Sequence, residues 1–96
     1  MINEVILVGS IAEVKGYITF NQRPFLHIQL CIEKSYQEID GCFKYEKIDC
    51  LVWKGEAKRV EGMLKEKPWL SIKGRLEKNR NGKMMVVAEK LKFLYW

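Results

Sequence analysis

The order of secondary-structure elements is clearest in EKIDCLVWKGEAKRVEGMLKEKPWLSIKGRLEKN, residues 46–79. Polar and apolar residues alternate over 43–54, which is typical of a β-strand. Over 56–66 the apolar residues recur at three- and four-residue intervals, and Pro68 closes the segment, so we predict one short amphipathic helix there. Alternation returns from Trp69 onward. A strand, a helix and another strand are therefore expected in succession.

The first of these strands has two unlike faces, because successive side chains point to opposite sides. Ile48, Cys50 and Val52 form an apolar face, which we expect to contact the core. Trp53 falls on the other face, in phase with Asp49. A tryptophan on a polar face either packs against something local or contacts a binding partner. We expect its ring to point outward.

Another strand is predicted over 2–14, where β-branched residues are frequent and both faces are apolar. Strands of this kind are buried on both sides, and in a chain this small the second burial could be a subunit contact. Gly9 within the strand indicates a bulge or a sharp bend, as at a barrel corner. The residues expected at the subunit contact are Ile2, Glu4, Ile6 and Val8.

Two further regions contain alternating residues. Over 25–34 the aliphatic side chains face inward, while Phe25 and His27 face outward, and His27 is expected to be a solvated or interface residue. The polar segment 35–41 predicts a loop or a long hairpin tip. The C-terminal part contains two strands around Asn81-Gly82, a strong signal for a tight type I′ turn.

The complete order is three strands, one helix and two strands. This is the order of the OB-fold, a five-stranded Greek-key barrel, with one short helix between strands 3 and 4. We therefore predict an all-β OB-fold barrel that forms a single domain over residues 1–96. Other small α+β folds share the same number of elements, so the pattern alone does not select the barrel.

Composition narrows the range of functions. The chain has a net charge of +5 and a pI near 9.2, which favours a partner with a phosphate backbone, although many basic proteins bind nothing acidic. Cys31, Cys42 and Cys50 form no C-x-x-C pair, and the single histidine has no metal-binding companion at a usual spacing. We expect free thiols in a reducing cytoplasm, with no metal and no cofactor.

The sequence also lacks the signals of several other classes. The start, MINEVILVGS, has no basic region and no cleavage site, and it is too short to span a bilayer, so neither a signal peptide nor a membrane partner is expected. No nucleophile elbow, Walker loop or zinc-protease motif is present, and the carboxylates are scattered among lysines. No catalytic residues are therefore expected.

Aromatic and basic residues are interleaved before and within the strand over 43–54 and in the last hairpin. Proteins that hold single strands combine a positive groove with aromatic rings on which bases stack, each stack contributing about 1–3 kcal/mol. Each residue alone also has an ordinary structural explanation, and it is their joint placement on an OB barrel that favours oligonucleotide binding. The candidate binding residues are Trp53, Tyr36, Phe43, Tyr45, Lys34, Lys47, Arg75, Lys78, Arg80 and Lys83.

Three segments resemble the bacterial single-stranded-DNA-binding protein family. The family's first strand, with its N-x-V-x-L-V-G pattern, is similar to MINEVILVGSIAE, and its third strand, helix and fourth strand are similar to residues 46–79. The closing strand is similar to VVAEKLKFL. The resemblance covers nearly the whole chain. It implies an OB barrel that dimerises through its first strand, assembles into dimers or tetramers and wraps single-stranded DNA without sequence preference.

The resemblance also implies roles for individual residues. Trp53 and Tyr36 stand where the family stacks bases on aromatic rings, and Arg80 and Lys67 lie near basic residues of the family. The chain departs from the pattern at the hairpin tip NRNGK, which has no aromatic residue, and at Lys47, where many members have one. Fewer stacking contacts and a steeper salt dependence are expected as a result.

The expected function is sequence-independent binding of single-stranded DNA in replication, repair and recombination. The expected protein is a cytoplasmic homo-oligomer with replication or helicase-loading proteins as further partners. The family's acidic C-terminal tip does not follow FLYW. This fits a chain from which the tail has been removed, a tail-less relative similar to primosomal replication protein N, or a mobile-element or phage copy. The alternative function is that of a primosome-type interaction module with weak DNA binding.

Overall fold

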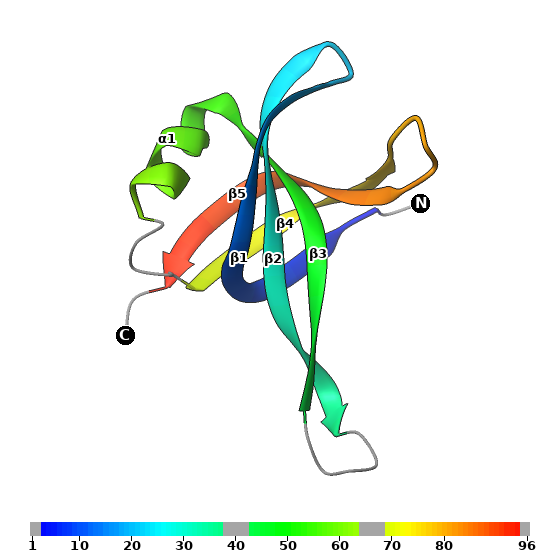
Figure 1. Ribbon diagram of the computed structural model, residues 1–96, viewed down its shortest axis with the longest axis vertical. Helices are drawn as coiled ribbons and strands as arrows, with labels where there is room; N and C mark the ends of the chain where they lie inside the picture. Colours follow the sequence, from blue (N-terminus) through cyan, green and yellow to red (C-terminus); the bar gives the residue numbers. More distant parts are fainter. Residues whose placement is uncertain (1–2, 38–42, 64–68, 95–96) are drawn as a thin grey trace.

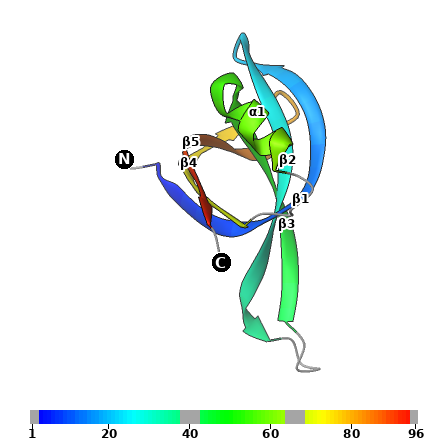
Figure 2. The ribbon, with the colours of Figure 1, turned by 90° about the vertical axis from the view of Figure 1, so that its left-hand side faces the viewer.

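The computed structural model describes residues 3–37, 43–63 and 69–94. The strands form a closed barrel in the order β1-β2-β3-β5-β4 (Figures 1 and 2). Strands β3 and β5 are parallel, and the other neighbours are antiparallel. The predicted OB-fold barrel, with a helix between the third and fourth strands, is confirmed. Its elements are β1 (Val5–Phe20), β2 (Arg23–Gln37), β3 (Phe43–Trp53), α1 (Lys54–Gly62), β4 (Trp69–Lys78) and β5 (Met84–Leu94).

Strand β1 belongs to both sides of the barrel and bends between them. Val5–Ser10 pairs with β4, and Ser10–Phe20 pairs with β2. Gly9 lies beside this change of partner, where a Cβ atom would collide with the carbonyl oxygen of Cys31. Only glycine allows the two backbones to approach so closely. The bend expected at Gly9 is therefore confirmed.

The β1–β2 hairpin is longer than the sequence pattern indicated. Strand β1 continues past residue 14 to Phe20, and β2 begins at Arg23 instead of residue 25. Asn21 and Gln22 join them with φ values of 49° and 66°. Positive φ at both central residues is typical of the two-residue type I′ hairpin turn. The turn was missed because glutamine rarely adopts this conformation.

The tip of the β4–β5 hairpin differs from the expected type I′ turn. Gly82 has a φ of 81°, but Asn81 is not among the described residues with positive φ, so the prediction is wrong. The N–H of Gly82 donates to the carbonyl of Asn79 at 3.0 Å, and the N–H of Asn79 donates to the carbonyl of Lys83 at 2.9 Å. The Asn79 side chain accepts the N–H groups of Asn81 and Lys83, both at 2.9 Å. This side chain stabilises a longer turn.

Two hydrophobic clusters lie on opposite faces of the sheet. The first fills the barrel interior and includes Cys50 and Val52, as the alternation predicted. Phe25 faces outward from the barrel interior, as the alternation predicted, but it is only 9% exposed. It is covered because Ile18 and Phe20 of the β1–β2 hairpin pack against its cluster. This second cluster, on what we call the outer face of β2, β3 and β5, consists of Phe25, Leu51, Met85 and Val87.

Helix α1 begins at Lys54, directly after β3, and ends at Gly62, with Met63 as its C-cap residue. Ala57 and Val60 are buried in the barrel core, which confirms the predicted apolar side of the helix. The predicted segment 56–66 extends into positions that lie outside the described residues. Across the described ranges, no helix is long and apolar enough to cross a membrane.

Candidate nucleic-acid interface

A groove of about 1040 Å³ lies between the tips of the two hairpins. One wall comes from residues 18–22 of the β1–β2 hairpin, and the other comes from Lys78–Asn81 at the tip of the β4–β5 hairpin (Figure 1). His27 and Met85, which project from the outer face, also line it. We call this the hairpin groove. The structure thus brings two chain segments far apart in sequence to one site.

The predicted cations of the last hairpin differ in their surroundings. Lys78 and Arg80 line the hairpin groove, are exposed, and form no ion pair within the described ranges. Arg75 instead donates from Nε to Glu77 at 2.8 Å, and its Nη1 lies 3.9 Å from Glu89. The Glu77 carboxylate raises the pKa of Arg75. Lys78 and Arg80 are therefore the cations of this set that remain available to a ligand.

A buried carboxylate lies next to the groove. Asp49 is 7% exposed and accepts hydrogen bonds from three side chains. Lys83 Nζ lies 2.7 Å from Oδ2, while His27 Nε2 and Gln29 Nε2 lie 2.8 Å and 3.3 Å from Oδ1. These contacts join β2, β3 and the residue before β5. Lys83, predicted to contact DNA, is therefore held by a carboxylate of the same chain.

The charge of Asp49 is maintained by these partners. Burial alone would raise the pKa of Asp49, but the hydrogen bonds from Lys83, His27 and Gln29 outweigh it and lower the pKa to about 2. Asp49 is therefore ionised at neutral pH. His27 is not freely solvated, since its side chain is 18% exposed and bonded to Asp49, and its other predicted role, that of an interface residue, stays a prediction.

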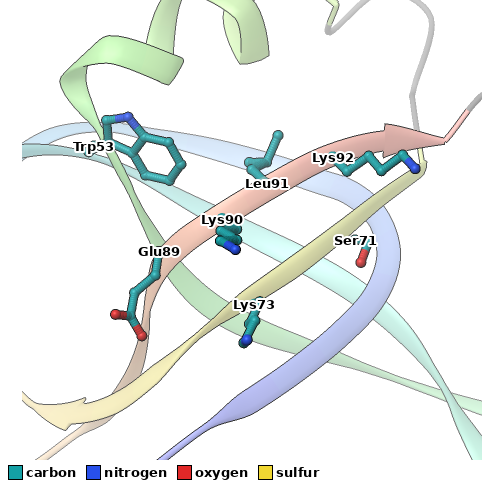
Figure 3. A pocket seen from close by; sticks show the side chains of 7 residues that line it. All are labelled: Trp53, Ser71, Lys73, Glu89, Lys90, Leu91 and Lys92. Atoms are coloured by element: carbon teal, nitrogen blue, oxygen red, sulfur yellow. The ribbon is translucent and has the colours of Figure 1, made fainter.

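Trp53 ends β3 on the outer face, directly before α1. Its ring is half-buried against both hydrophobic clusters, whereas the sequence predicted an outward-pointing ring. The strand ends where α1 and the two clusters meet, so the indole has neighbours on several sides. Trp53 also lines a second groove of about 560 Å³, which we call the tryptophan groove (Figure 3). Its other lining residues are Ser71, Lys73, Glu89, Lys90, Leu91 and Lys92.

Of the remaining predicted binding residues, the structure describes the side chain of Lys47 alone. Lys47 is exposed on the outer face, two residues before Asp49. Lys67 lies outside the described residues. Four others have backbones in β2 or β3 and side chains outside the described part, namely Lys34, Tyr36, Phe43 and Tyr45.

The predicted subunit contact is exposed in this chain. Ile6 and Val8 have exposed fractions of 67% and 49%, so burial of both faces of β1 would need a second chain. Glu4 lies 2.7 Å from Lys73 Nζ of the neighbouring strand. Ile2, the fourth residue of this prediction, lies outside the described residues.

The cysteines do not form a reactive or metal-binding group in the described structure. Cys31 and Cys50 are free thiols, as predicted, and Cys42 lies outside the described residues. Burial raises the pKa of Cys50 to about 12, which keeps this thiol protonated and unreactive. No cluster of three or more His, Cys, Asp or Glu side chains suited to a metal ion occurs among the described residues.

Sequence reasoning missed the Asp49 network and the two lysines Lys90 and Lys92. A signal for the network was present, because alternation places His27 and Gln29 on one face of their strand. Finding it required the pairing of Gln29 with Asp49 across β2 and β3, which is a property of the barrel. The two lysines looked like ordinary surface residues of the last strand.

Comparisons with known proteins bear on the fold and the family. No protein-family model matches the sequence. The single-stranded DNA-binding protein 1 of Streptococcus pyogenes serotype M18 (strain MGAS8232) is 26% identical over 94 residues, which cover 93% of this chain and 72% of that protein. The small single-stranded DNA-binding protein from Streptomyces coelicolor has a similar structure, with a TM-score of 0.70 and 14% identity over 97% of this chain and 95% of its own. The resemblance to the single-stranded-DNA-binding protein family is confirmed.

Two further structures extend this likeness. The SSB of Plasmodium falciparum, solved in complex with single-stranded DNA, matches with a TM-score of 0.69 and 14% identity over 99% of this chain and 96% of its own. The dimeric N-terminal domain of PriB from Thermoanaerobacter tencongensis matches with a TM-score of 0.61 and 19% identity, and 98% of each chain is covered. The likeness to single-stranded-DNA-binding proteins therefore spans the barrel, α1 and both hairpins.

Proposed function

We propose that this protein binds single-stranded DNA without sequence preference and serves in DNA replication, repair and recombination. The observation that carries the proposal is the hairpin groove, which lies between the β1–β2 and β4–β5 hairpins and has Lys78 and Arg80 on its rim. OB-folds bind oligonucleotides on the β2–β3 face and with the loops of these two hairpins. Proteins of similar sequence and fold are single-stranded-DNA-binding proteins, which supports the same assignment.

In this proposal the two contributions to affinity come from different residues. Lys78 and Arg80 neutralise phosphates, and Lys47 adds a third exposed cation on the outer face. Phosphate contacts release counterions and are insensitive to sequence. Trp53 supplies a stacking surface, to which Tyr36, Phe43 and Tyr45 are expected to add. Arg75 and Lys83 contribute less than the sequence predicted, because carboxylates of the chain already bind them. Lys34 and Lys67 remain proposed phosphate contacts.

The experiment is a titration of fluorescently labelled oligo-dT followed by anisotropy, at low and at moderate salt. Lys78→Gln combined with Arg80→Gln should reduce the slope of log K against log salt by about 1.4, because each phosphate contact to a single strand contributes about 0.7. The matched control is Lys15→Gln combined with Lys58→Gln, which removes two exposed charges from positions that line neither groove. Absence of binding by the wild type at low salt would contradict the proposal and favour the protein-interaction module.

The proposal also includes a homo-oligomer formed through β1. Ile6 and Val8 are the exposed aliphatic residues that such a contact would cover. The dimeric PriB domain shows that an OB barrel of this shape can pair. Ile6→Lys should reduce the molar mass measured by light scattering to that of one chain, whereas an unchanged mass would argue against this interface. The proposed activity is binding without catalysis, in a reducing cytoplasm.

A further inference from the structure

The residues that line the tryptophan groove lie outside the tips of the two hairpins. It is lined by Trp53 at the end of β3, by Ser71 and Lys73 of β4, and by residues 89–92 of β5 (Figure 3). In Figure 3 the indole of Trp53 stands at one end of the group, and the side chains of β5 extend away from it towards Lys92. An aromatic surface and a series of cations thus share one groove.

Some charged side chains in the tryptophan groove are already paired within the chain, and others are free to contact a ligand. Lys73 is bound to Glu4 at 2.7 Å, and Glu89 lies 3.9 Å from Arg75, so one cation and the acidic residue of the lining are already paired. Lys90 and Lys92 are exposed and take part in no ion pair in the described part of the chain. Two free positive charges therefore remain beside Trp53. A groove of this kind fits a polyanion that also carries flat rings.

Strand β5 contributes lining residues to both grooves. Met85 lines the hairpin groove and belongs to the outer-face cluster against which Trp53 packs. Lys92 lies seven residues further along the same strand, a distance of about 23 Å at the rise of a β-strand. A single strand that enters between the hairpins can therefore follow β5 past Trp53 to the free lysines.

We propose that the single-strand site continues beyond Trp53 along the tryptophan groove, where the phosphates that follow the base stacked on Trp53 contact Lys90 and Lys92. This inference rests on the proposed function and adds a path and a length to it. Short oligonucleotides occupy the hairpin groove alone, and longer ones reach both grooves. The two lysines thus extend the site to a face of the barrel formed by β4 and β5.

The experiment compares two lengths of labelled oligo-dT, about four and about sixteen nucleotides, the range of site sizes known for OB-folds. Lys90→Gln combined with Lys92→Gln should weaken binding of the longer oligonucleotide about tenfold at low salt and reduce its salt slope by about 1.4, with no change for the shorter one. Lys15→Gln combined with Lys58→Gln is the control with the same net charge, and it should affect both lengths only slightly.

Two outcomes would overturn the inference. Equal affinities of the Lys90/Lys92 variant and the control for the longer oligonucleotide, with the wild type still binding it, would remove the tryptophan groove from the path and leave the proposed function intact. Failure of the wild type to bind either length would overturn the proposed function and this inference together. Thermal unfolding of each variant shows whether its fold is intact, and both pairs are expected to melt as the wild type does.

Discussion

The hairpin groove and the tryptophan groove hold their cations in different ways. In the hairpin groove, Lys78 and Arg80 lie at the tip of a hairpin, and Lys83 next to them is bound by the buried Asp49. In the tryptophan groove, Lys90 and Lys92 project from a paired strand, and Lys73 is bound by the exposed Glu4. Each groove therefore has free basic side chains in its lining, and a basic side chain that is already paired lies in the lining or next to it. The number of basic residues in a segment consequently overstates the charge available to a ligand.

The Asp49–Lys83 pair is partly buried, whereas the Glu4–Lys73 pair is exposed. This difference in burial predicts the largest difference in stability between variants. Asp49→Ala should lower the free energy of unfolding by about 2–3 kcal/mol, because it leaves His27, Gln29 and Lys83 without their shared acceptor. Glu4→Ala should cost much less, since both side chains of its pair with Lys73 are more than a third exposed and solvent screens their charges. Urea unfolding measures both. Equal losses would show that the buried network is no stronger than the surface pair.

Trp53 connects the two grooves, and its replacement tests packing and binding at once. Trp53→Ala should lower stability by about 2 kcal/mol, because the half-buried ring packs on both clusters. It should also weaken binding of the longer oligo-dT, which reaches the tryptophan groove, by about 1–3 kcal/mol through the lost stacking surface. Trp53→Phe is the control that keeps an aromatic ring. A Phe variant with normal stability and normal affinity, beside an Ala variant that is folded but weak, would confirm stacking.

Some features of the fold and the site could be predicted from the sequence, and others could not. The order of elements, the interior face of β3 and the bend at Gly9 were predicted correctly, because each depends on local pattern or on the family resemblance. The burial of Phe25, Asp49 and part of Trp53 was not predicted. Alternation gives the two faces of a strand, but it does not show that the β1–β2 hairpin packs on the outer face of this barrel.

The two hairpin turns also differ from what their local sequences predict. Asn81-Gly82 has the preferred sequence of a type I′ turn, yet the side chain of Asn79 stabilises a longer turn instead. Asn21 and Gln22 adopt positive φ with a less favourable sequence, because the pairing of β1 with β2 fixes the hairpin length. In both cases longer-range contacts determine the conformation of residues whose local preferences point elsewhere.

Acid conditions should weaken the Asp49 network. The pKa of Asp49 is about 2 in the folded protein and 3.8 ordinarily, so the carboxylate contributes stability above pH 4 that is lost as the pH falls from about 4 to 2. The expected loss is about 1–2 kcal/mol, after allowance for screening by solvent. Unfolding of the wild type and of Asp49→Asn in urea, measured across this interval, checks it. The variant should lack this part of the decrease, and parallel curves would contradict the assignment.

The smallest effect is expected at the hairpin tips, which belong to the hairpin groove alone. Gly82→Ala should cost about 1 kcal/mol, since a side chain is disfavoured at its φ of 81° although no atom lies within 4 Å of the added Cβ. Gln22→Gly should stabilise the other tip by about 0.5 kcal/mol for the converse reason, its φ being 66°. Because Arg80 lies in the turn that Gly82 closes, Gly82→Ala should also weaken binding of short oligo-dT more than Gln22→Gly does. Equal affinities of the two variants for short oligo-dT would mean that the position of Arg80 does not depend on this turn.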